Sequence, residues 1–238
     1  MKMSLSKFFI LAAIILVFSF AVFGILYIID PAGLREKPAK VKAAKDEVPV
    51  SKPENLYWKN VTPSAPWETR DSGETFLFQN KMWLIGGLDG NTKVGENNLV
   101  EYWAAPHFND VWNTEDGINW TQVATSNAWT PRRSMSVVSF NGKLWMFGGW
   151  SPITGYTNDI WVSDNGIDWV QVAKSANWSA REGQLAVAFQ NKIWLIGGVN
   201  YDERQTKNEV WYSENGTDWT EVKNIPWKPR WDHAIAVL

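Results

Sequence analysis

The residues that could carry out chemistry are few and far apart. The chain has 238 residues, no cysteine and two histidines, His107 and His233. Without cysteine there can be no disulfide, thiolate nucleophile or cysteine-ligated metal, and two separated histidines do not suggest a multi-histidine metal site. The sequence also contains no G-x-S-x-G, P-loop or H-E-x-x-H motif. We therefore expect no cofactor and no metal ion.

Three short acidic segments could be read as calcium loops. They contain Asp116-Gly117, Asn165-Gly166 and Asn215-Gly216. They lack the alternating oxygen ligands of a calcium loop, whereas Asp-Gly and Asn-Gly are typical of tight hairpin turns. We interpret these segments as turns between strands.

The composition is ordinary apart from its tryptophans. Charged residues make up 20% of the chain and the formal net charge is −2, which gives no electrostatic reason to expect a nucleic-acid partner. The 17 tryptophans are far above ordinary usage. Such an excess indicates either a repeat that reuses tryptophan in its core or a surface that uses it for recognition.

The tryptophans follow a repeat with a period of about 50 residues. Related segments begin at residues 109, 158 and 208 (NDVWNTEDGINW, NDIWVSDNGIDW and NEVWYSENGTDW), and KMWLIGG, KLWMFGG and KIWLIGG begin at residues 81, 143 and 192. A Trp followed three residues later by Arg occurs at residues 67, 129, 178 and 227. Hairpin signals separate the short apolar runs, so each unit is predicted to form four antiparallel strands. Four strands per repeat is typical of a β-propeller blade.

These units resemble kelch repeats, in which an apolar strand ends in Gly-Gly and a distal Trp follows. The hairpin S-x-[DN]-G-x-x-W, as at 163–169 and 213–219, resembles a bacterial-type variant of the repeat. The resemblance covers about residues 55–238 and implies an all-β, kelch-type propeller with three full blades. It implies no activity. The copper chemistry of galactose oxidase, which has a kelch propeller, needs a cysteine that this chain lacks.

Some positions carry the same residue type in each repeat, and we call these positions the repeat columns. Most of their residues are expected to be structural. The tryptophans are predicted to fill the core between blades, and the arginines to pair one blade with the next rather than to clamp a substrate. The column residues that we assign to structure are Gly86, Gly87, Gly148, Gly149, Gly197, Gly198, Trp120, Trp169, Trp219, Arg70, Arg132, Arg181 and Arg230.

Aromatic residues outside the columns are the candidate binding site. They lie on predicted connections that emerge on one face of a kelch propeller, the face with which family members usually bind partners. The candidates are Tyr102, Trp103, His107, Phe108, Trp150, Tyr156, Tyr201 and Trp231. Exposed aromatic rings give large contact area, so a protein or glycan ligand is expected. The alternatives are that these rings only pack the loops, or that the chain is a glycan-active enzyme of sialidase-like layout.

The two ends of the repeat region are incomplete. Residues 56–61 match a fourth strand and residues 230–238 match a first strand, so we expect partial strands there. Because propellers usually have about 4–8 blades, we interpret the chain as a truncated propeller. Bare strand edges favour association, so self-association is a further prediction.

The N-terminal region predicts a membrane anchor. Residues 8–29 form an uncharged apolar run after a short tail, 1–7, and 22 helical residues would rise about 33 Å, enough to cross a bilayer. A cleaved signal peptide is the alternative. Residues 30–54 are rich in Lys, Ala and Pro and are predicted to form a stalk. The lysines and arginines after the run argue against export, but the usual layout of a tethered all-β domain leads us to expect an extracytoplasmic propeller.

Overall fold

The computed structural model describes residues 59–62, 64–91 and 103–237. The chain divides into two units, Met1–Pro63 and Ser64–Leu238. In the first unit the Thr62 backbone N–H donates to Asn60 Oδ1 at 3.1 Å. The predicted tail, anchor and stalk (1–7, 8–29 and 30–54) lie outside the described residues. In the part that is described, no helix is long and apolar enough to span a bilayer.

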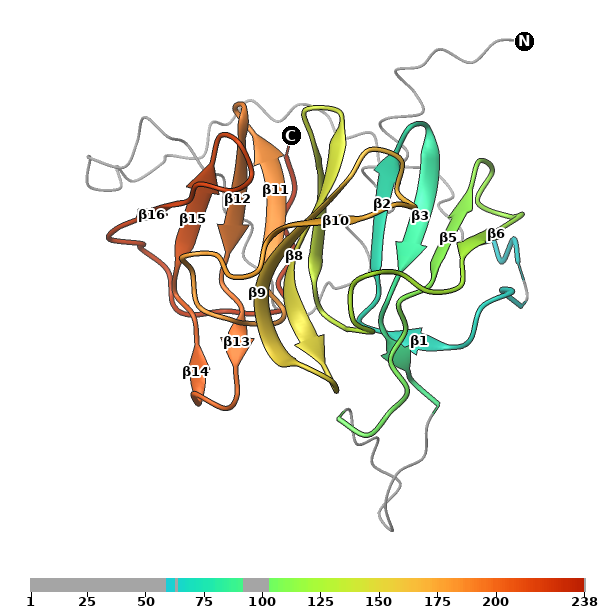
Figure 1. The fold of residues 1–238 in the computed structure, drawn as a ribbon, viewed down its shortest axis with the longest axis horizontal. Coiled ribbons are helices and arrows are strands. Elements are labelled where there is room, and N and C mark those ends of the chain that lie inside the picture. The colour runs from blue at the N-terminus through green and yellow to red at the C-terminus, as the bar shows by residue number, and fades with distance from the viewer. Residues whose placement is uncertain (1–58, 63, 92–102, 238) are drawn as a thin grey trace, which may run out of the picture. The chain divides into compact units, whose positions relative to one another are not determined.

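Three four-stranded antiparallel sheets form the body of the second unit (Figure 1). We call them blades one, two and three. Blade one contains β2 (Glu74–Phe78), β3 (Lys81–Ile85), β5 (Val111–Thr114) and β6 (Thr121–Ala124). Blade two contains β7 (Ser136–Phe140), β8 (Lys143–Ser151), β9 (Gly155–Ser163) and β10 (Val170–Ala173), and blade three contains β11 (Leu185–Phe189), β12 (Lys192–Ile196), β15 (Val210–Ser213) and β16 (Thr220–Val222). The four predicted strands of each unit are confirmed.

Two smaller sheets extend blades one and three. β1 (Arg70–Asp71) pairs with β4 (Leu88–Asp89), and β13 (Val199–Asn200) pairs with β14 (Gln205–Thr206). In blade two the corresponding residues do not separate from the main sheet, because β8 and β9 continue as one long hairpin. All three extensions lie at the same end of the blades (Figure 1).

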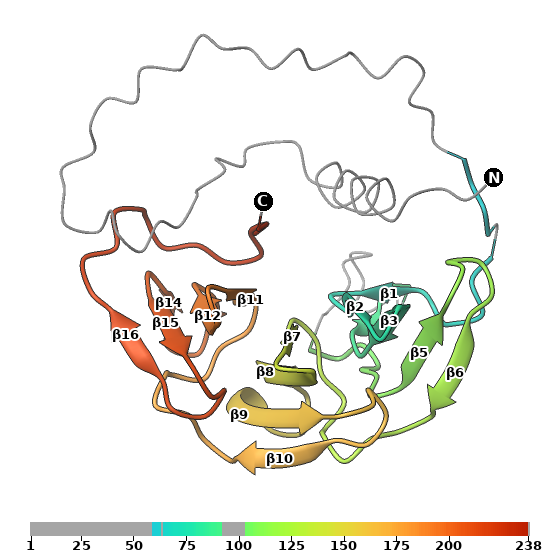
Figure 2. The ribbon, with the colours of Figure 1, turned by 90° about the horizontal axis from the view of Figure 1, so that it is seen from above.

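The first strand of each blade is the innermost, and β7 lies between β2 and β11 (Figure 2). Backbone hydrogen bonds join the starts of these strands. Ser134 N donates to Ser72 O at 2.9 Å, Gly183 N to Ser134 O at 3.0 Å, and Asp232 N to Gly183 O at 2.9 Å. The four residues share a left-handed φ between 44° and 64°. This repeated conformation links one blade to the next.

Tryptophans before the Gly-Gly pairs also connect blades. The Trp83 ring lies against Gly166 of the next blade, so tightly that a Cβ on Gly166 would be 2.8 Å from Trp83 Cζ3. Trp145 meets Gly216 of blade three in the same way. Each indole N–H donates to the hairpin carbonyl of its own blade, as Trp83 Nε1 does to Phe78 O at 2.9 Å. The hairpin glycine therefore provides the space that the ring of the preceding blade fills.

The predicted turn chemistry accounts for the acidic hairpins. In blade two the Asn165 side-chain oxygen accepts from the backbone N–H groups of Ile167 and Asp168, and Ser163 Oγ accepts from Gly166 N. Asp116 accepts the same two bonds in blade one, and these backbone N–H groups hold its pKa far below the usual range. These side-chain oxygens therefore accept hydrogen bonds from the backbone of their own hairpin. Within residues 59–62, 64–91 and 103–237 no group of three His, Asp or Glu side chains is placed to hold a metal ion.

The outer face of blade one is uncovered at a position that is buried in the other blades. Met82 is 44% exposed, whereas its counterparts Leu144 and Ile193 are 0% exposed. The difference arises because blades two and three each pack against a preceding blade. Leu77, paired with Met82 across β2 and β3, is exposed as well.

The partial terminal strands are a correction. Residues 231–237 form no strand, and neither do residues 59–61, the described part of the predicted leading strand. A strand requires a neighbour that supplies a ladder of donors and acceptors. The C-terminal segment instead contacts blade three through separate backbone hydrogen bonds at Arg230 and Asp232.

Candidate functional site

The candidate site lies at the end of the blades where the chain leaves the second strand of each sheet. In blade two this exit passes through Gly148 and Gly149, whose φ values are 58° and 101°. A Cβ on Gly149 would lie 2.7 Å from Arg133 O, so only glycine fits there without a shift. The strand pairing slips by one residue at this point and then continues to Ser151.

Trp150 consequently lies on a strand, which corrects its predicted place in a short loop. It pairs with Tyr156 of β9 on one side and with Arg133 on the other. The Arg133 guanidinium lies 4.5 Å from the Trp150 ring centroid, and the His107 ring lies 5.2 Å from it. Trp150 is therefore half-buried between a cation and a second aromatic ring.

A buried ion pair between blades two and three supports this arrangement. Arg133 Nε donates to Glu182 Oε2 at 2.8 Å, and Arg133 Nη2 donates to Glu182 Oε1 at 3.2 Å. Both side chains are less than a tenth exposed. The two parallel hydrogen bonds fix the orientation of the Arg133 guanidinium. They therefore also fix how the guanidinium stacks on the Trp150 ring.

The remaining aromatic residues come from blade three and the C-terminal segment. The Tyr201 and Trp231 rings meet edge to face, with centroids 5.8 Å apart. The Tyr156 phenol lies close to the backbone of Tyr201, which brings the blade-two hairpin beside this pair. Burial, with the negative charge of Glu182, raises the Tyr156 pKa to about 12. The same two causes raise the Tyr201 pKa, with Glu182 and Asp232 nearby.

These contacts bring residues from three blades and the C-terminal segment into one group. We call it the loop-face cluster, and it consists of His107, Arg133, Trp150, Tyr156, Glu182, Tyr201 and Trp231. Tyr201 is 51% exposed and Trp231 is 44% exposed. Together the two tyrosines, the two indoles and the ion pair form an amphipathic contact surface.

Three of the predicted binding residues are not part of this cluster. Trp103 is 66% exposed and has no aromatic contact with the cluster. Phe108 packs under a structural arginine, with its centroid 4.4 Å from the Arg70 guanidinium carbon. Tyr102 lies outside the described residues. The structure thus brings together five of the eight candidates.

Sequence reasoning missed Arg133 and Glu182, which hold the cluster together. Both occupy the position directly after a column arginine, where Asp71 and Trp231 stand in the other repeats. The sequence does show that this position differs from its neighbours, because its residue type changes in every repeat while the arginine before it is constant. A variable position on a repeated scaffold is where binding residues are expected.

The column arginines pair within their own blade, which corrects the predicted pairing between blades. Arg132 donates to Asp159 through two nitrogens, at 2.7 and 3.0 Å, and to Gly148 O at 3.0 Å. Arg70 pairs with Asp110, and Arg181 pairs with Glu209. The blade-to-blade contact uses the arginine backbone instead, as in Gly149 N donating to Arg181 O at 2.9 Å. The guanidiniums of Arg70, Arg132 and Arg181 are thus engaged, unlike the free arginine ring that a sialidase-like site would need.

Burial and pairing act in opposite directions on Asp159. Burial would raise its pKa, but hydrogen bonds from Arg132 and the charge of Arg132 outweigh burial, so the Asp159 pKa lies below its usual range. The Trp161 indole N–H also donates to Asp159 Oδ2 at 2.7 Å. The pair is ionised and fully hydrogen-bonded.

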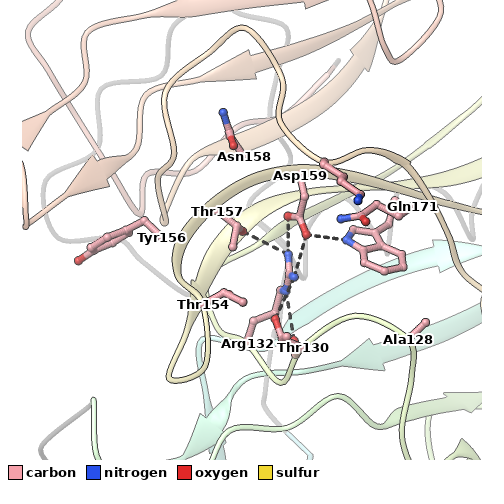
Figure 3. A pocket seen from close by; sticks show the side chains of 11 residues that line it. Ala128, Thr130, Arg132, Thr154, Tyr156, Thr157, Asn158, Asp159 and Gln171 are labelled. Atoms are coloured by element: carbon pink, nitrogen blue, oxygen red, sulfur yellow. Dashed lines mark hydrogen bonds and ion pairs between the residues drawn. The ribbon is translucent and has the colours of Figure 1, made fainter.

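A cavity of about 340 Å³ opens over this ion pair on blade two (Figure 3). Figure 3 shows Arg132 pointing at Asp159, with Thr130 and Thr157 beside it. The lining residues are Ala128, Thr130, Arg132, Thr154, Tyr156, Thr157, Asn158, Asp159, Trp161, Gln171 and Lys174. Tyr156 thus belongs both to this cavity and to the loop-face cluster.

Comparison with known proteins identifies the family. Residues 32–238 match the family model described as the KLHDC2/KLHL20/DRC7 kelch-repeats domain. No curated protein matches the chain. The family match covers most of the sequence and agrees with the three four-stranded sheets and the Gly-Gly exits described above. The chain belongs to the kelch-repeat family.

Proposed function

We propose that this kelch-repeat domain is a protein-interaction module that binds its partner with the loop-face cluster. Kelch-repeat domains generally bind proteins, and the family match supports this general function. The more specific assignment to the loop-face cluster depends on geometry. Its aromatic residues come from separate blades, and a buried ion pair and ring contacts connect them.

The observation that carries the proposal is the exposure of Tyr201 and Trp231 on a rigid base. Half-exposed aromatic rings that are already ordered lose little conformational entropy when a partner covers them. The Arg133–Glu182 pair of the same cluster is buried. Exposed aromatic rings that adjoin a fixed ion pair provide the kind of contact area found at protein-binding hot spots.

Alanine variants of the full chain test this proposal. We expect Trp231→Ala and Tyr201→Ala to weaken partner capture at least tenfold, about 1.4 kcal/mol each, while changing the melting temperature little. Val170→Ala is the control, because Val170 is also exposed, at 62%, but lies on the outer strand β10. A buried-core control, Trp145→Ala, should destabilise the fold by about 3–5 kcal/mol. Equal loss of capture in Val170→Ala, or no loss in Trp231→Ala, would refute the assignment.

We further propose that residues 8–29 tether the domain to a membrane, with the domain on the extracytoplasmic side. The support is the length and apolar character of this segment. The full chain should then remain with membranes after alkaline carbonate extraction. A cytoplasm-dependent reporter fused after Leu238 that gives full signal would contradict the orientation.

Binding of a glycan remains an alternative outcome of the same test. If capture with the loop-face cluster is abolished by glycosidase treatment of the partner fraction, the ligand is a glycan rather than a protein surface.

Self-association also stays a prediction, and the exposed Leu77 and Met82 on blade one are where we expect it.

A further inference from the structure

We infer that the cavity over the Arg132–Asp159 pair on blade two binds a carboxylate carried by an acidic side chain of a protein partner. The source of the carboxylate rests on the proposed protein-binding function, whereas the site itself rests on the cavity and its lining. The lining comes from the connection before β7, from the β8–β9 hairpin and from β10.

One position beside the ion pair differs in side-chain size among the three repeats. In each blade the repeated arginine pairs with an acidic residue, which is Asp110, Asp159 or Glu209. The residue two positions before this acid is Phe108 in blade one, Thr157 in blade two and Lys207 in blade three. The Phe108 ring covers Arg70 at 4.4 Å, and the Lys207 side chain is buried with its ammonium held by Glu203 and Gln205. In blade two the smaller Thr157 accepts from Arg132 Nη1 through Oγ1 at 3.3 Å, and Arg132 stays buried. Thr157 therefore lines the cavity beside the ion pair, at a position that bulkier side chains occupy in the other blades.

The charges of the lining favour an anion. Arg132 and Asp159 neutralise each other through two hydrogen bonds. Lys174 also lines the cavity, and no carboxylate in the described part of the chain pairs with it. The lining therefore carries one uncompensated positive charge, which an anionic ligand would neutralise.

The hydrogen-bonding groups agree with this charge. Thr130 Oγ1 accepts from Arg132 Nη2 at 3.1 Å, so its O–H remains able to donate. Thr154, Gln171 and Lys174 supply further donors. A hydroxyl, an amide and an ammonium around one opening satisfy the acceptor-only oxygens of a carboxylate.

The position of the cavity agrees with a protein source. Tyr156 lines the cavity and also lies close to the Tyr201 backbone within the loop-face cluster. A partner seated on the loop-face cluster could therefore place an acidic side chain in the adjoining cavity.

The probe that tests the site is N-acetyl-glutamate α-methylamide, which carries a single side-chain carboxylate. Its binding to the full chain is measured by ligand-observed NMR, beside the uncharged glutamine analogue. We expect the glutamine analogue to bind about three- to tenfold more weakly, and Lys174→Gln to weaken binding of the glutamate probe by a similar factor. Thr157→Phe, which copies blade one, should abolish binding.

Lys228→Gln is the matched control, because it removes an exposed lysine outside the lining and should change binding less than twofold. If Thr157→Phe lowers the melting temperature, Lys174→Gln decides the test, since an exposed lysine can be replaced without loss of packing. Equal binding of the two analogues, or no effect of Lys174→Gln, overturns the site. Tighter binding of glucuronate than of the glutamate probe assigns the carboxylate to a sugar acid and overturns the protein source.

The result separates this site from the proposed function. Probe binding that depends on Lys174 while partner capture ignores Trp231→Ala supports the site and refutes the loop-face assignment. Capture that depends on Trp231 while no probe binds leaves the loop-face assignment intact and overturns the site.

Discussion

Replacing Gly166 by alanine should destabilise the protein much more than replacing Gly142 by alanine. Both glycines have a left-handed φ, 79° and 75°. A Cβ on Gly142 meets nothing within 4 Å, whereas a Cβ on Gly166 would lie 2.8 Å from Trp83 Cζ3 and 2.9 Å from Trp83 Cη2. The two variants therefore share the cost of the backbone conformation and differ in the packing between blades one and two.

The magnitude follows from these two contributions. The left-handed conformation costs an L-residue about 1–2 kcal/mol, and inserting a methyl group into a packed core costs about 1–3 kcal/mol more. We expect losses in the free energy of unfolding of about 1–2 kcal/mol for Gly142→Ala and about 2–5 kcal/mol for Gly166→Ala. In a Trp83→Ala background, where the ring is gone, the two losses should become equal.

Urea denaturation of the full chain, followed by tryptophan fluorescence, measures these differences. The double-mutant comparison isolates the contact between Trp83 and Gly166. Equal losses for Gly142→Ala and Gly166→Ala in the parent chain would refute the conclusion that adjacent blades stack through tryptophan on glycine.

Further predictions concern charged groups. Asp159→Asn should destabilise the fold by about 3–5 kcal/mol at neutral pH, because it leaves Arg132 buried and unpaired. Pairing lowers the pKa of Asp159 in the folded state, so the ionised carboxylate stabilises the fold above its unfolded pKa, and this stabilisation is lost as the pH falls through the folded pKa. The free energy of unfolding of Asp159→Asn should therefore depend less on pH below about pH 4 than that of the parent chain. Burial raises the Glu74 pKa to about 8, so stability should fall as the pH rises from 4.5 to 8. Thermal melts of Glu74→Gln should therefore show stabilisation at pH 8 and little change at pH 4.

The repeat made the fold largely predictable from the sequence. Hairpin signals and the columns of Trp, Gly-Gly and Arg located the strands of all three blades. The direction of the arginine side chains could not be predicted in this way. A repeated Arg and a repeated acid, such as Arg132 and Asp159, can pair within a blade or between blades with the same spacing in the sequence.

The candidate site was less predictable because its residues are not repeated. Trp150 follows Gly-Gly, and in blades one and three the main sheet ends there, so the sequence indicated a loop. Whether the strand continues depends on Tyr156 pairing across the hairpin, a contact that no local pattern encodes. The cavity depends similarly on which side chains the fold brings into its lining, Thr157 and Lys174 among them.

The most direct test of the protein-binding account is site-specific photo-crosslinking of the full chain in its native cell. A photoreactive phenylalanine analogue is placed at Tyr201 or Trp231, and, as controls on the outer strand β10, at Val170 or Val172, all of which are exposed. We predict that one partner protein crosslinks to positions 201 and 231 and does not crosslink to positions 170 and 172. Crosslinks confined to β10, or the absence of any crosslink at positions 201 and 231, would contradict the conclusion that the loop-face cluster is the binding surface.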